Sequence, residues 1–141
     1  MKFMLIWRTT SDTVWDNYGD IDFDKMIETV GRFNEEMIEA GILLAAEGLA
    51  DPSDNGVVVD FSSEPPVVTD GPYGETKELF NGFYLIDVPT KEDAIAWAKK
   101  APIQGPGFAT EIRRVPTIDE FPQDNEWIQK ELAWRKANNQ L

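Results

Sequence analysis

Two segments with the hydrophobic spacing of a helix each lie between two strand-like runs, and this order constrains the fold more than any other feature. In residues 22–40 and 90–100, apolar side chains recur three and four positions apart, as on one face of a helix. The four flanking runs are rich in strand-forming residues and lie at residues 2–7, 42–49, 80–88 and 108–115. The order strand, helix, strand, strand, helix, strand predicts an α+β domain with a ferredoxin-like split βαβ repeat.

In such a domain both helices cover one face of an antiparallel sheet, and the other face must be covered by something else. The run from Lys2 to Trp7 is apolar on both faces, and so is the run from Phe83 to Ile86. The simplest cover is the same sheet of a second copy, so the sequence predicts a homodimer. The segment after residue 115 could cover the sheet instead, and this alternative stays open.

An excursion interrupts the repeat between its second and third strands. A turn cluster at residues 52–56 precedes a short strand at 57–61, and residues 67–69 extend the chain again after two prolines. The sequence Asp70-Gly71-Pro72 then predicts a tight turn. Gly82, inside the following strand, predicts a bulge or a close approach of another backbone.

The ionisable side chains limit the chemistry that the chain can support. Its 141 residues include 26 acidic and 13 basic side chains, which gives a formal net charge of −13. Such a charge repels phosphate backbones and anionic membranes, so we expect no nucleic-acid partner and no membrane partner. The sequence has no cysteine and no histidine, which excludes thiolate chemistry and the usual histidine base. The acidic stretch 16–24 lacks the spacing of a calcium loop, and we expect no metal and no cofactor.

The two ends of the chain carry different signals. The apolar run near the start is far shorter than the ~20 residues that span a membrane, and Arg8 and Asp12 follow it at once, unlike in a signal peptide. We therefore expect a cytoplasmic protein. Pro116 and Pro122 bracket an arm, and residues 126–136 have helical spacing. The predicted organisation is a domain at residues 1–115 followed by a C-terminal arm and helix at 116–141.

The stretch VVTDGPYGETKELFNGFYLIDV, residues 67–88, resembles the signature of the DGPF-type YCII-related family, with Tyr73 where phenylalanine is usual. The similarity includes the EGL of residues 47–49 and runs from Met1 to about Val115. It implies a ferredoxin-like dimeric α/β barrel. It implies little about activity, because the group is known mainly as stand-alone domains or as neighbours of transcription-initiation factors. The wider superfamily contains isomerases, monooxygenases and dehydrochlorinases, and the His–Asp pair proposed for some members has no counterpart in a chain without histidine.

Charged residues near this signature form the candidate site. Carboxylates close to a lysine in a sheet-lined pocket can share protons or hold a polar ligand. Arg8, at the end of the first strand, either neutralises a ligand carboxylate or pairs with Glu47. Asp70-Gly71-Pro72 also has a purely structural interpretation, in which Asp70 caps the turn. The candidate pocket residues are Arg8, Glu47, Asp70, Glu75, Lys77 and Tyr84.

The leading hypothesis is a homodimeric binding or accessory module whose cavity between the sheets accepts a small, partly apolar molecule. Its mouth is predicted near Glu47, Asp70, Glu75 and Lys77. A first alternative is a cofactor-independent lyase or isomerase in which a carboxylate or Tyr84 carries protons in place of histidine. A second alternative is a purely structural or transcription-associated interaction module. The sequence leaves open whether the chain is an enzyme.

Overall fold

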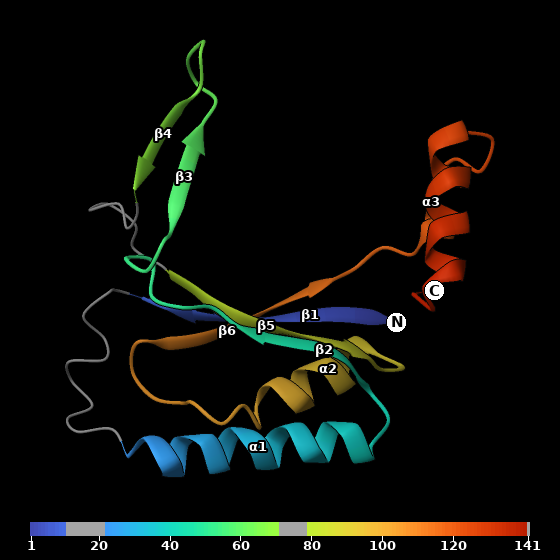
Figure 1. Ribbon diagram of the computed structural model, residues 1–141. Helices are drawn as coiled ribbons and strands as arrows, with labels where there is room; N and C mark the ends of the chain where they lie inside the picture. The colour runs from blue at the N-terminus through green and yellow to red at the C-terminus, as the bar shows by residue number, and fades with distance from the viewer. Residues whose placement is uncertain (11–21, 71–78, 141) are drawn as a thin grey trace.

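A computed structural model of the chain describes residues 1–10, 22–70 and 79–140 (Figure 1). One layer is a four-stranded sheet of β1 (Lys2–Thr9), β2 (Leu43–Gly48), β5 (Leu79–Asp87) and β6 (Phe108–Arg114). The second layer contains two helices, α1 (Phe23–Glu39) and α2 (Lys91–Ala98). The other described elements are a hairpin of β3 (Val57–Asp60) and β4 (Val67–Asp70), a 3₁₀ turn, η2 (Ile118–Glu120), and a C-terminal helix, α3 (Glu126–Ala137).

The strand order of the four-stranded sheet is β2-β5-β1-β6, and each strand is antiparallel to its neighbours. The predicted α+β class is confirmed, and this order, with α1 and α2 on one face, is consistent with the predicted ferredoxin-like repeat. In the part of the chain that the structure describes, the sheet does not close into a barrel. We call the face opposite α1 and α2 the open face, because these helices leave it uncovered (Figure 1).

Helix α1 begins and ends where its sequence predicts. Asp22 caps the start, since its carboxylate accepts a hydrogen bond of 3.0 Å from the backbone amide of Lys25. Gly41 has a φ of 69°, the left-handed conformation that glycine readily adopts after a helix. Between these ends, the apolar stripe buries Phe33 and Met37 against the sheet.

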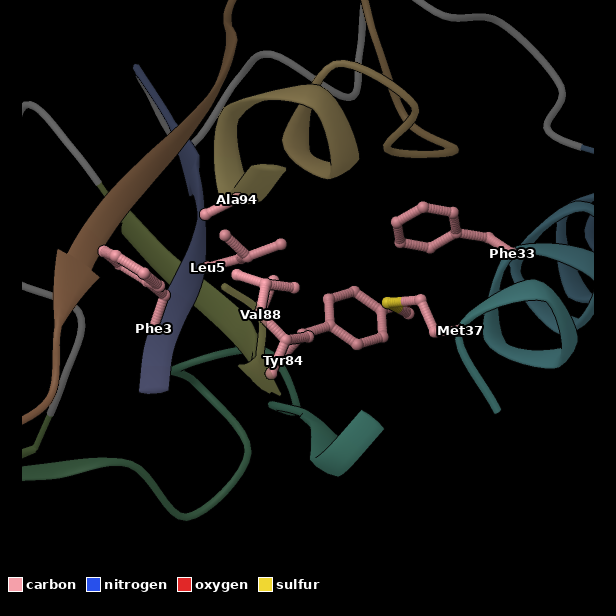
Figure 2. Close-up of a cluster of buried hydrophobic side chains, with 8 residues drawn as sticks. Phe3, Leu5, Phe33, Met37, Tyr84, Val88 and Ala94 are labelled. Atoms are coloured by element: carbon pink, nitrogen blue, oxygen red, sulfur yellow. The ribbon is translucent and has the colours of Figure 1, made fainter. Parts of the chain in front are cut away.

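The core lies between the sheet and these two helices. Figure 2 shows the side chains of Phe33 and Met37 pointing from α1 toward Tyr84 of β5. The ring of Phe33 meets that of Tyr84 edge-on, with centroids 5.4 Å apart, and lies 6.2 Å from the ring of Trp97 on α2. Such contacts add to the free energy gained by removing the rings from water. The remaining buried members of the cluster are apolar: Phe3, Leu5, Ile86, Val88 and Ala94.

Gly82 is a residue of β5, which pairs with β2 on one side and with β1 on the other. The pairing with β1 is irregular next to Gly82. Its φ is 155°, and a Cβ atom at this position would lie 2.6 Å from the carbonyl oxygen of Glu47. The register between β1 and β5 shifts beside it, between Trp7 and Arg8. The sequence predicts a bulge or a close backbone approach at Gly82, and the structure contains both.

Two elements leave the sheet at opposite ends and stand on the side of the open face (Figure 1). The hairpin follows the end of β2, where Gly48 pairs with Gly82. The C-terminal segment follows the end of β6, where Arg114 pairs with Phe3. The predicted C-terminal helix is present as α3. The division into a domain at residues 1–115 and an arm at 116–141 stays a prediction.

The start of the C-terminal segment is held by an ion pair between Arg114 and Glu120. The guanidinium donates two hydrogen bonds, of 2.6 and 2.8 Å, to the two oxygens of Glu120. These bonds, together with one from the amide of Thr117, lower the pKa of Glu120 to about 2. An exposed pair contributes little to stability, but two parallel bonds fix the relative direction of the two groups. The pair therefore orients the segment that leads to α3.

Candidate functional site

The open face has an apolar centre. Side chains alternate between the two faces along a strand, and the buried core residues of β1 and β5 point toward the helices. The residues between them therefore point to the open face, and these are Met4 and Ile6 on β1 and Phe83 and Leu85 on β5. Met4 lies opposite Leu85, and Ile6 lies opposite Phe83. All four side chains remain partly exposed in a single chain, so an apolar surface lies at the middle of this face.

One group of charged side chains lies toward the end of the open face where β2 ends. Arg8 of β1 donates a hydrogen bond to Glu111 of β6, with 2.5 Å between Nη1 and Oε2. The two side chains keep 32% and 37% of their surface exposed, so a bound molecule could reach this pair. Glu47 lies on β2, opposite Phe83, and is exposed. We call Arg8, Glu47 and Glu111 the charged cluster.

The structure therefore places two predicted site residues, Arg8 and Glu47, at the same end of one face. Among the described residues, however, Arg8 forms an ion pair with Glu111, and β5 separates the strand of Arg8 from that of Glu47. The sequence predicted that Arg8 binds either a ligand carboxylate or Glu47, and it did not predict the ion pair with Glu111. The residue that sequence reasoning missed is Glu111. The alternation of residues 108–115 predicts which side chains share a sheet face with Glu111. Only the pairing of β6 with β1 shows that Arg8 is its neighbour.

Tyr84, another predicted site residue, lies on the opposite face of the sheet from the charged cluster. It is 4% exposed, and its ring meets those of Trp7 and Phe33 at 5.2 and 5.4 Å. Burial raises the pKa of its hydroxyl to about 12. The structure therefore assigns Tyr84 to the core and does not bring it to the open face.

Three further predicted site residues belong to the signature. Asp70 is the last residue of β4, where it lies opposite Val57 and is exposed. Glu75 and Lys77 lie outside the described residues, as does the rest of the predicted turn after Asp70. Their place in a site stays a prediction.

A groove of about 710 Å³ lies between the open face and the C-terminal segment, and sequence reasoning missed it. Its apolar floor is shared with the sheet, because Ala45 and Leu85 line it. Residues from both the sheet and the C-terminal segment give it charges, namely Lys2, Asp87, Asp119 and Arg135. No sequence signal could reveal it, because the groove depends on the direction in which the chain leaves β6.

Within residues 1–10, 22–70 and 79–140, no group of three acidic side chains is placed to hold a metal ion. None of the helices in the same ranges is both long and apolar enough to cross a membrane. What the open face offers is an apolar surface for the body of a molecule and charged groups that can make strong hydrogen bonds with its polar end.

Most of the chain matches a known protein family. A sequence model of the YCII-related domain matches residues 1–118, which include the four-stranded sheet, α1 and α2. The chain belongs to the YCII-related family. This membership confirms the family that the signature predicts. Helix α3 of this YCII-related chain lies beyond the matched residues.

A relative of the chain is known from Rhizobium meliloti (strain 1021), where it carries the name "Uncharacterized protein R00369". It is 30% identical over 76 residues, which are 54% of this chain and 60% of that protein. The chain thus spans less than two thirds of the length of this relative. The name of the relative states no activity, and YCII-related membership alone states none for this chain.

Proposed function

We propose that this YCII-related chain forms a homodimer through its open face, and that the dimer binds a small, partly apolar molecule between its two sheets. The observation that carries the proposal is the apolar centre of the open face, which lies next to the charged cluster. Two such faces in contact would form the dimeric α/β barrel that the family resemblance implies, with apolar walls and charged groups at its mouth.

Burial of the apolar centre favours this dimer. Fully burying an apolar side chain of this size contributes about 1.5–3 kcal/mol relative to leaving it exposed. The four side chains of each copy are already partly buried, so only part of this free energy remains to be gained. Association costs about 4–15 kcal/mol in lost motion. The apolar centres therefore offset much of that cost, and contacts outside them set the final affinity.

The class of ligand follows from the lining of the proposed cavity. An apolar body would lie against the apolar centre, and one charged or hydrogen-bonding group would meet the charged cluster. A carboxylate on the ligand would compete with Glu111 for Arg8, whereas an amine would bind Glu47 or Glu111.

The two alternatives use the same face differently. An acid–base enzyme has less support, because Tyr84 faces the helices with its pKa raised to about 12 and Glu111 is paired with Arg8. A purely structural or transcription-associated module would use the open face for contact alone, with the space between the sheets filled by side chains.

Replacing Ile6 with glutamate should convert the dimer into a monomer. Two copies of the new carboxylate would be placed in the apolar contact, and burial of an unpaired charge is strongly unfavourable. Light scattering at micromolar concentration measures the effect, and circular dichroism shows that the variant is folded. The matched control is Ile38→Glu, since Ile38 of α1 is 63% exposed and lies away from the open face. A monomeric wild type, or an unchanged dimer of Ile6→Glu, would refute the proposed dimer.

The ligand is tested with alkyl carboxylates, alkyl amines and alkyl alcohols of matched chain length. Any molecule that binds only the folded state stabilises it, by about 2.7 kcal/mol at a concentration of 100 times its Kd. We expect one of the three series to raise the Tm of the wild type and of Ile38→Glu but not that of Ile6→Glu. A dimer whose Tm responds to no series would favour the purely structural alternative.

A further inference from the structure

We propose that, in the dimer, the β3–β4 hairpin of each copy packs against helix α3 of the other copy. This inference rests on the proposed homodimer, and it adds a contact outside the two open faces. It concerns two apolar surfaces that the described part of a single chain leaves uncovered.

The hairpin is exposed on both of its faces. Five valines, three on β3 and two on β4, are between 43% and 61% exposed. Figure 1 shows the hairpin standing clear of the four-stranded sheet. A two-stranded hairpin without further contacts is marginally stable at best in water, and exposed apolar strands favour unwanted pairing. Contact with an apolar surface would therefore stabilise the hairpin.

Helix α3 presents the second uncovered surface. Trp127 and Trp134 are seven residues apart, which places them on one face of the helix, and they are 71% and 54% exposed. The half-buried Ile128 and Leu132 lie on a different side of the helix, so the tryptophans do not face the rest of their own chain. Tryptophan is enriched among the residues that anchor protein interfaces. The Trp127–Trp134 face is therefore a docking surface.

The charges of these two elements are complementary. Residues 51–70, which contain the hairpin, carry five acidic side chains and no basic one. Helix α3 carries three basic and two acidic side chains, and Lys130 and Arg135 pair with the two acidic ones, so the helix keeps one excess positive charge in a chain whose net charge is −13. One of its lysines, Lys130, lies 4.2 Å from the ring of Trp127, beside the apolar surface. Opposite charges favour contact of the hairpin with α3, and like charges oppose contact of two hairpins.

Symmetry makes this contact possible twice. Two open faces can meet about a two-fold axis that runs either along the strands or across them. An axis along the strands brings the two hairpins to the same end of the dimer, so their acidic residues come near one another. An axis across the strands exchanges the two ends of the sheet and keeps its edges, and the two elements leave opposite ends on the same side (Figure 1). The end of α3 lies beside β2, the strand that the hairpin follows, because Arg135 shares a groove with Ala45. Each hairpin therefore meets the partner's α3. The charges select the axis across the strands.

The contact is tested by cross-linking between two single-cysteine chains. The wild type has no cysteine, so each introduced thiol is unique. One chain carries Val68→Cys in β4, and the other carries Ala137→Cys in the last turn of α3. The second chain is uniformly labelled with ¹⁵N, so that mass spectrometry distinguishes mixed from like-with-like products. After mixing and treatment with a short bismaleimide, we expect mixed products to exceed like-with-like products about tenfold or more. Glu35→Cys, exposed on α1, is the control and should give only background.

A second measurement does not depend on the cross-linker. The double variant Trp127→Ala/Trp134→Ala should raise the Kd of the dimer about tenfold or more. Phe23→Ala, which removes a 65% exposed ring on α1, should leave the Kd unchanged. Three results in an intact dimer would overturn this inference and leave the proposed dimer standing. They are cross-links mainly between two Val68→Cys chains, no cross-links above background, or an unchanged Kd of the tryptophan variant. A monomeric wild type would instead contradict the proposed function.

Discussion

Replacing Phe33 with alanine is expected to lower the free energy of unfolding by about 3–5 kcal/mol. Phe33 is 4% exposed, and its ring lies against those of Tyr84 and Trp97, from both the sheet and α2. The substitution removes the transfer free energy of the ring and leaves a cavity at the point where the two layers meet. Urea denaturation at a fixed protein concentration measures the loss, since dimerisation would make stability depend on concentration.

The control for this prediction lies on the same helix. Phe23→Ala makes the same chemical change at a position that is 65% exposed, so we expect it to change stability by no more than about 0.5 kcal/mol. If both variants lost the same amount, helix formation in α1 rather than packing of the core would control stability.

Replacing Gly82 with alanine is expected to cost about 2–4 kcal/mol, although it adds only a methyl group. The φ of 155° is unfavourable for any residue with a side chain, and the new Cβ would lie 2.6 Å from the carbonyl oxygen of Glu47. Strand β2 must therefore move away from β5. We expect this movement to appear in amide NMR spectra as large shifts at Glu47 and Gly48, measured alongside urea denaturation.

Gly31→Ala is the matched control, and its expected effect has the opposite sign. Gly31 lies inside α1, and a Cβ atom there would meet nothing within 4 Å. Alanine at an unstrained helix position stabilises by about 0.5–1 kcal/mol relative to glycine. If Gly82→Ala were also neutral or stabilising, the contact between the backbones of β2 and β5 would be looser than the structure shows.

Much of the fold could be predicted from the sequence because its signals are local. The apolar spacing in residues 22–40 indicated a helix there, and α1 (Phe23–Glu39) buries Phe33 and Met37 on that apolar stripe. A glycine inside an apolar strand indicated the close approach at Gly82. Each of these predictions depends on residues that are near one another in the chain, where periodicity and backbone preference act directly.

The site was harder to predict, because it depends on which distant segments meet. Arg8 and Glu111 are brought together only by the pairing of β1 with β6. Tyr84 was a candidate because its hydroxyl could carry a proton in place of histidine. Residues 83–86 are apolar on both faces, so alternation did not show that Tyr84 faces the helices. The structure resolves this by placing Tyr84 in the core. The groove beside the C-terminal segment likewise depends on the direction in which the chain leaves β6 and returns toward β2.

The position of β1 in the sheet has a consequence for biosynthesis. This strand is made before both of its neighbours in the sheet, since β5 begins at Leu79 and β6 at Phe108. While the ribosome adds the intervening residues, an apolar strand waits with both edges unpaired, in a topology whose long sequence separations slow folding. The sheet can be completed only after β6 has emerged, so β1 stays exposed to unwanted pairing until residues 108–114 are available.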